Sequence, residues 1–181
     1  AAEYEGTFLY ASPMHIRLLA SSKKQVHLPS LQSVISTTTG ISPLICKTFE
    51  EKYRLPVSQA FGIIEAGLPI INLRQSSEHP EAVGFGLPSF TIAILDHSFK
   101  PVPPGETGQL AIKGPGMFDG YLSPPTRREE VLKEGWFITG DLASMTIDGL
   151  VEIKGRTKNV INVLGNKVFP SEVEEVINQF Q

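Results

Sequence analysis

The chain of 181 residues is long enough for one domain or two small ones, and it has no apolar run near the roughly 18 residues that a membrane span requires. Its 16 basic and 19 acidic residues give a net charge of −3, so no basic field indicates a nucleic acid or an anionic membrane as a partner. The single cysteine, Cys46, excludes a disulfide framework within the chain and is typical of a reducing compartment, from which we expect a cytoplasmic protein.

Residues 1–72 alternate between helical and strand patterns. Ser12-Pro13 and Ser42-Pro43 each place a capping hydroxyl before a proline at the first helical position, and each predicts a helix start. Residues 31–36 and 57–61 are short apolar runs typical of buried strands. Strands that alternate with helices predict a parallel α/β layer.

The pattern changes after residue 72. Short apolar runs at 90–95 and 109–113 are separated by a Pro- and Gly-rich turn, which is typical of antiparallel strands. We therefore expect residues 73–153 to form a β-barrel-like subdomain, so that the chain as a whole is of the mixed α/β class. Inside it, Thr126 and Glu129 form a capping box that predicts a short helix.

The last part of the chain predicts strand, basic corner, hairpin and helix start in that order. Apolar runs at 150–153 and 159–163 flank a Lys-Gly-Arg corner, and a Gly165-Asn166 turn leads to a third strand. Ser171 and Glu174 form a second capping box, which predicts a helix with Val173, Val176, Ile177 and Phe180 on its apolar face.

A family resemblance rests on three motifs in this part of the chain, namely Trp136-Phe-Ile-Thr-Gly-Asp141, Gly155-Arg156 and Gly165…Pro170-Ser-Glu-Val-Glu174. They resemble those of the adenylate-forming, AMP-binding enzymes, which include acyl-CoA synthetases, luciferases and the adenylation domains of peptide synthetases. Matching motifs follow one another in order from about Ser36 to Glu174. The resemblance implies that residues 1–72 belong to the α/β portion of a large domain, 73–153 to its β-barrel-like subdomain, and 154–181 to a hinge and the start of a small C-terminal domain.

Glu65 follows a buried strand. A carboxylate at such a strand end suits Mg²⁺, although the residues alone fit better with a glutamate at a helix start. The resemblance implies a catalytic Glu65 that coordinates Mg²⁺ on the ATP phosphates, with Phe61 near the adenine and Gly62 beside it. The chain departs from the family at Ile64, where a threonine usually touches the phosphate, so we expect weaker adenylation because a hydroxyl donor is lost.

Gly40 and Ile41 lie in the small-residue run Thr37–Ser42. The resemblance implies that this loop lines the adenine and acyl pocket, where small side chains permit close approach of the backbone. From the residues alone, an ordinary strand-to-helix loop capped by Ser42 fits equally well.

Asp141 follows a Thr-Gly pair that predicts a tight turn. A carboxylate there can accept two ribose hydroxyls, but it can equally cap its own loop as an Asx turn. The resemblance implies that Asp141 binds the ribose and that Arg156 approaches the same ribose and phosphate, for which a permanently charged guanidinium is suited. The alternative for Arg156 is a surface residue at a turn.

The resemblance also implies roles around the Lys-Gly-Arg corner. Lys154 matches the position at which the small domain turns between two half-reactions, and an exposed lysine at a turn is the alternative. Asn162 and Gly165 match the region that the pantetheine arm of CoA or of a carrier protein passes.

Two family motifs do not occur in these residues, namely the Gly/Ser/Thr-rich phosphate loop with its lysine and the catalytic lysine of adenylation. We therefore expect a fragment of an ATP-dependent ligase that joins a carboxylic acid to AMP and then to a thiol such as CoA, in fatty acid metabolism, and that is inactive by itself. Two alternatives remain open: an acyl-AMP ligase or carrier-loading adenylation domain, and a non-catalytic binding or scaffold module.

Overall fold

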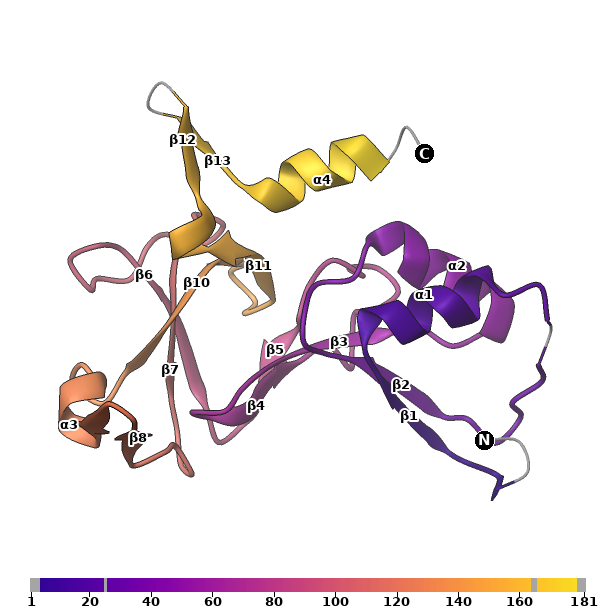
Figure 1. Ribbon diagram of the computed structural model, residues 1–181, viewed down its shortest axis with the longest axis horizontal. Helices are drawn as coiled ribbons and strands as arrows, with labels where there is room; N and C mark the ends of the chain where they lie inside the picture. The colour runs from indigo at the N-terminus through magenta and orange to yellow at the C-terminus, as the bar shows by residue number, and fades with distance from the viewer. Residues whose placement is uncertain (1–3, 25, 164–165, 179–181) are drawn as a thin grey trace. The chain divides into compact units, whose positions relative to one another are not determined.

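A computed structural model describes residues 4–24, 26–163 and 166–178 (Figure 1). The chain divides into two compact units, of which the first comprises Ala1–Gly62 and Ile70–Phe85 and the second Ile63–Pro69 and Gly86–Gln181. The domain boundaries expected at residues 72 and 153 stay predictions.

The first unit is built on parallel strands. Its elements in chain order are β1 (Phe8–Ala11), α1 (Pro13–Ser21), β2 (Ser33–Ser36), α2 (Pro43–Tyr53) and β3 (Ser58–Ile63). β2 lies between β1 and β3 and runs parallel to both, with Phe8 opposite Ser33 and Ile35 opposite Ser58. The predicted α/β layer is confirmed.

The two helices of this unit begin where the Ser-Pro pairs predict, because each proline occupies the start of its helix. The serine side chains do not act as predicted, since neither caps a backbone N–H. The Ser12 hydroxyl pairs instead with His15 Nδ1 at 2.8 Å. α1 and α2 lie side by side (Figure 1), and Ile16 and Phe49 are fully buried in the core that they share with the strands.

Two further strands extend this sheet, β4 (Gly67–Ile71) and β5 (Phe85–Gly86), in the order β1-β2-β3-β4-β5. The turn Ile64–Ala66 joins β3 to β4, and so short a connection can only join antiparallel neighbours. The sheet is therefore mixed.

The second unit contains an antiparallel sheet in the order β11-β10-β7-β6. Its strands are β6 (Thr91–Leu95), β7 (Gly108–Lys113), β10 (Phe137–Met145) and β11 (Val151–Arg156). Leu110 and Ile112 of β7 are fully buried. The antiparallel character is confirmed, and in the described part of the chain the barrel-like subdomain is an open sheet with β11 and β6 at its edges.

A small hairpin in the second unit is formed by β8 (Gly120–Leu122) and β9 (Pro125–Arg127), and α3 (Arg128–Val131) follows it. The predicted capping box is wrong by one residue, because the Arg127 N–H donates to Glu130 Oε1 at 3.4 Å. The Thr126 hydroxyl donates to the carbonyl of Pro124 at 3.1 Å and is not available as a cap.

The chain continues with η2 (Thr157–Asn159), the antiparallel hairpin β12 (Ile161–Val163) and β13 (Asn166–Val168), and α4 (Pro170–Asn178). Strand, hairpin and helix occur as predicted. The second capping box is wrong because α4 begins at Pro170, which places Ser171 inside the helix. The three valine and isoleucine residues predicted for its apolar face are exposed, and Phe180 lies outside the described residues. Within the described ranges, no helix is both long and apolar enough to cross a membrane.

Candidate functional site

Asp141 is presented by an irregular part of a strand rather than by a turn. The pairing of β10 with β7 shifts between Ile138 and Leu142, and Gly140 has φ +77° at this point. Glycine adopts this conformation without steric cost. The tight turn expected at Thr139-Gly140-Asp141 is therefore wrong, and a bulge in β10 places Asp141 opposite Arg156 of β11.

Asp141 and Arg156 form a cross-strand ion pair, with Arg156 Nε 2.8 Å from Asp141 Oδ1. The Asp141 side chain is 6% exposed and that of Arg156 is 57% exposed. Burial raises the pKa of the Asp141 carboxyl, and Arg156 and the Thr139 hydroxyl lower it in part. Thr139 Oγ1 also accepts the Asp141 N–H at 3.0 Å, which ties the bulge together.

The second oxygen of this carboxylate, Asp141 Oδ2, is buried and has no hydrogen-bond partner within residues 4–24, 26–163 and 166–178. A buried acceptor without a donor is costly, so this oxygen fits a ligand that brings a hydroxyl. Asp96 shows what a loop-capping carboxylate looks like in this protein, because its Oδ1 accepts the N–H groups of Ser98 at 2.7 Å and Lys100 at 2.9 Å. Asp141 is arranged differently from such an Asx turn.

Glu65 lies in the turn between β3 and β4, so the helix-start alternative is wrong. Its Oε1 accepts a hydrogen bond of 2.8 Å from the Tyr121 hydroxyl, and its backbone carbonyl accepts the N–H of Phe118 at 2.9 Å. Burial raises the pKa of Tyr121, and the contact with Glu65 adds to this effect, so the phenol stays a donor. The neighbouring Ile64 side chain is 98% exposed.

In the first unit, the loop before α2 is held against β3. The Ile41 N–H donates to Gln59 Oε1 at 3.1 Å, and the amide nitrogen of Gln59 donates to the carbonyl of Pro80. Because side chains two residues apart on a strand share a face, Phe61 projects from the same face of β3 as Gln59. The structure thus brings the Gly40-Ile41 loop to the face that carries Phe61, and Ile41 is buried while Gly40 is exposed.

Lys154 lies inside β11, two residues before the strand ends. The register passes from Leu142–Gly155 to Ala143–Ile153, so Lys154 is the additional residue of a β-bulge. Its ammonium is 2.6 Å from Glu152 Oε2.

The two residues predicted for the thiol region are described only in part. Asn162 belongs to β12, where its Cα is opposite Lys167. Gly165 lies outside the described residues.

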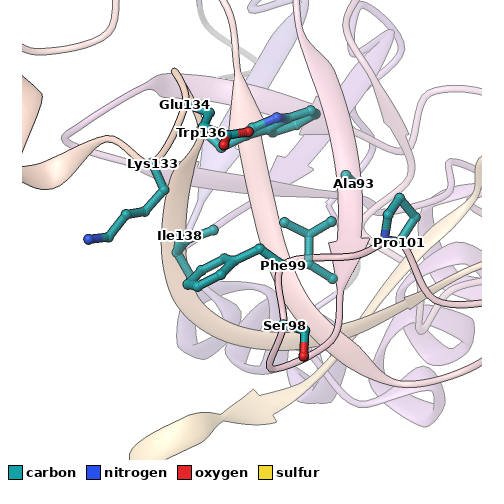
Figure 2. Close-up of a pocket in the computed structure, with 9 residues that line it drawn as sticks. Ala93, Ser98, Phe99, Pro101, Lys133, Glu134, Trp136 and Ile138 are labelled. Atoms are coloured by element: carbon teal, nitrogen blue, oxygen red, sulfur yellow. The ribbon is translucent and has the colours of Figure 1, made fainter.

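A hollow of about 520 Å³ in the second unit has no residue in common with the predicted site (Figure 2). Ala93 and Ile138, from two strands of the antiparallel sheet, line it together with the rings of Phe99 and Trp136. No group of three or more potential metal-ligating side chains occurs in the described part of the chain.

Residues 1–122 match the family of AMP-binding enzymes. The chain belongs to this family. Its relatives include the long-chain-fatty-acid–CoA ligase of Salmonella typhimurium, which is 37% identical over 122 residues, or 67% of this chain and 22% of the ligase. Feruloyl-CoA synthase from an Amycolatopsis species is 35% identical over 172 residues, or 93% of this chain and 35% of the synthase.

The fold of this member of the AMP-binding enzyme family is also similar to that of solved structures. The crystal structure of ATP-bound MatB from Rhodopseudomonas palustris matches with a TM-score of 0.85 at 28% identity, over 94% of this chain and 35% of MatB. The mixed α/β class is thereby confirmed. The chain spans about a third or less of the length of these three proteins.

Among the site residues predicted from the sequence, Asp141 and Arg156 touch directly. Sequence reasoning missed Tyr121, because it lies 56 positions from its partner Glu65. The signal available was the two aromatic residues Phe118 and Tyr121 close together in the run 116–121.

Proposed function

We propose that this chain is part of an AMP-forming ligase that activates a carboxylic acid with ATP and transfers the acyl group to a thiol, for which CoA is the favoured acceptor. The observation that carries the proposal is the buried Asp141 Oδ2 beside the Arg156 ion pair. A ribose hydroxyl would supply the donor that this oxygen lacks. Family membership supports the same reading.

In this proposal Asp141 accepts ribose hydroxyls, and Arg156 supplies a permanent positive charge toward the ribose and phosphate. The exposure of the Arg156 side chain, 57%, leaves the guanidinium accessible to an anionic ligand. In the first unit, Phe61 and Gly62 on β3 and the loop of Gly40 and Ile41 would contact the adenine.

Glu65 is the residue that would hold Mg²⁺. Magnesium is commonly bound by one or two carboxylates together with substrate phosphates, so a single carboxylate without a cluster of ligands fits this ion. Bound Mg²⁺ would neutralise phosphate charge. Glu65 would present its carboxylate at a fixed position. Ile64 offers no hydroxyl, so the phosphate would have one hydrogen-bond donor fewer.

The thiol-transfer step is supported by the relatives, which are a CoA ligase and a CoA synthase. We propose that the bulge at Lys154 is the hinge between the two half-reactions and that Asn162 and Gly165 lie along the path of the pantetheine arm. At a bulge, a strand changes direction through a change in only a few backbone dihedral angles. The 181 residues by themselves are expected not to adenylate, because the phosphate loop and the catalytic lysine that the resemblance requires do not occur in them.

The test is ATP–pyrophosphate exchange by the complete protein that contains this chain, measured with a panel of carboxylic acids. Asp141→Ala should lower exchange with the preferred acid by at least about a hundredfold, which corresponds to the loss of about 3 kcal/mol of nucleotide binding in the transition state. The matched control is Asp96→Ala, which removes a carboxylate that caps its own turn and should leave exchange unchanged. Equal exchange by the wild type and Asp141→Ala would contradict the ribose role.

Two other functions remain candidates and the same assay separates them. If exchange occurs but no thioester forms with CoA, the chain belongs to an acyl-AMP ligase or a carrier-loading domain. If no acid supports exchange and calorimetry detects no ATP binding, a non-catalytic binding module derived from this fold is the better description, and the exposed Ile64 in place of a threonine is the observation that favours it.

A further inference from the structure

The Glu65 carboxylate is held by a hydroxyl from a distant part of the sequence. Tyr121 Oη donates to Glu65 Oε1 at 2.8 Å. Beside this contact, the Phe118 N–H donates to the Glu65 carbonyl at 2.9 Å. The segment that carries Phe118 and Tyr121 therefore engages Glu65 through its main chain and through a side chain.

This segment is itself anchored. The Phe118 ring packs edge-on against Tyr121, with ring centroids 4.8 Å apart, and against Phe137, with centroids 5.7 Å apart. Arg128 Nη1 donates to the carbonyl of Phe118 at 3.2 Å. Tyr121 lies on β8, which is paired with β9. A tyrosine held by its strand and by a neighbouring ring brings its hydroxyl to Glu65 with little rotamer freedom left to lose.

The turn that carries Glu65 does not offer such support of its own. The residues on either side, Ile64 and Ala66, have no polar side-chain atom, and Ile64 is 98% exposed. The described contact that restrains the carboxylate itself is therefore the hydrogen bond from Tyr121.

We propose that Tyr121 is a positioning residue for Glu65, fixing one carboxylate oxygen and thereby the orientation in which this side chain meets the divalent cation of Mg-ATP. The inference rests on the proposed role of Glu65. A hydrogen bond to a ligating carboxylate restrains it in its binding orientation, and outer-shell partners of this kind raise metal affinity. Tyr121 itself does not touch the cation.

The experiment is calorimetric binding of ATP to the complete protein at a series of Mg²⁺ concentrations. Tyr121→Phe keeps the ring and its packing on Phe118 and removes only the hydroxyl. The Mg²⁺ concentration for half-maximal enhancement of ATP affinity should rise about three- to tenfold. ATP affinity without Mg²⁺ and the melting temperature without ligand should stay at their wild-type values.

The matched control is Tyr53→Phe, which removes a tyrosine hydroxyl that donates to the carbonyl of Leu19 at 3.3 Å in the other compact unit. It should leave the Mg²⁺ dependence unchanged. Glu65→Gln should abolish most of that dependence, and Tyr121→Phe added to Glu65→Gln should change nothing further, because the two side chains act through one contact.

The possible results distinguish the positioning role of Tyr121 from the proposed role of Glu65. A lost Mg²⁺ response in Glu65→Gln with a wild-type response in Tyr121→Phe overturns the positioning role and leaves the role of Glu65 intact. A wild-type response in Glu65→Gln overturns both. A Tyr121→Phe protein that binds ATP less tightly at every Mg²⁺ concentration and melts at a lower temperature has a structural tyrosine, which also overturns the inference. Absence of ATP binding by the wild type would overturn the proposed function itself.

Discussion

Burial and the neighbouring positive charge shift the pKa of the Asp141 carboxyl in opposite directions. Burial raises its pKa more than Arg156 and Thr139 lower it, so the group takes up a proton at a higher pH than an ordinary aspartate. Because its folded-state pKa is raised, this carboxyl contributes stability that is fully present below the unfolded pKa and is lost as the pH rises through the folded pKa. The ionised side chain therefore costs folding stability, as is common for groups held ready for a ligand.

The first prediction at this scale concerns pH and ligand affinity. A ribose hydroxyl donates more strongly to an ionised carboxylate, so affinity for adenosine should fall as the pH is lowered toward the raised pKa of Asp141, and the fall should begin at a higher pH than an ordinary aspartate would give. Adenosine is the probe because it has no phosphate group that titrates as the pH is lowered. Asp141→Asn should bind weakly with no such pH dependence in calorimetry, whereas Asp96→Asn should follow the wild type. An affinity that is flat with pH in the wild type would contradict the argument.

Single residues also show where prediction from sequence ends. The sequence indicates both Asp141 and Arg156, which the structure pairs, yet it predicts a turn where a bulge brings them together, because Thr-Gly-Asp fits either conformation and the partner strand decides. The contact between Glu65 and Tyr121 depends on tertiary structure across 56 positions, so the two neighbouring aromatic residues in the run 116–121 do not reveal Glu65 as the partner.

Among the elements, α2 ends in a way that its residue type opposes. Arg54, its C-cap, has φ +58° and ψ +30°, and its N–H donates to the carbonyl of Glu50 at 2.7 Å. A side chain in this left-handed conformation costs about 1–2 kcal/mol relative to glycine. The helix start, by contrast, agrees with its sequence, since Pro43 has the φ that a first turn needs.

This mismatch predicts a stabilising substitution. Arg54→Gly should raise the free energy of unfolding by about 0.5–1 kcal/mol, because relief of strain exceeds the added entropy of the unfolded chain. Thermal unfolding of the protein measures the gain as a rise in melting temperature of roughly 1–4 °C. Lys47→Gly, at an exposed position in the middle of α2, is the control and should lower stability by about 1 kcal/mol. If both variants lose stability equally, the left-handed cap is not strained.

Comparison of the predicted with the observed elements shows which of them local sequence patterns reveal. Helices α1 and α2 and the strands of the first unit follow from proline positions and apolar periodicity, which are local. The two capping boxes failed because a Ser or Thr followed by Glu at the right spacing is common, while the actual start depends on neighbours: β9 ends at Arg127, and Pro170 already opens α4.

For the whole molecule, the chain belongs to the AMP-binding enzyme family but spans about a third or less of the length of its relatives. In its second unit, Asp141 precedes the Lys154 bulge in the chain, and Arg156, the hairpin β12–β13 and α4 follow it. Gly155 next to the bulge is close-packed, since an added Cβ would lie 3.2 Å from Phe169 Cδ1. A change of backbone angles at Lys154 would therefore also move the segment that follows.

This arrangement gives a prediction for the complete protein. Lys154→Pro restricts φ at the bulge to about −65° and should hold the chain in one conformation. If the bulge is the hinge, one half-reaction should survive: pyrophosphate exchange within about threefold of the wild type, with thioester formation reduced at least about a hundredfold, because a conformational step is then blocked. Lys154→Ala removes the ion pair with Glu152 and leaves the backbone free, so both half-reactions should persist. Equal loss of both half-reactions in Lys154→Pro would show that the bulge is part of the folded core, and wild-type rates of both would place the hinge elsewhere in the chain.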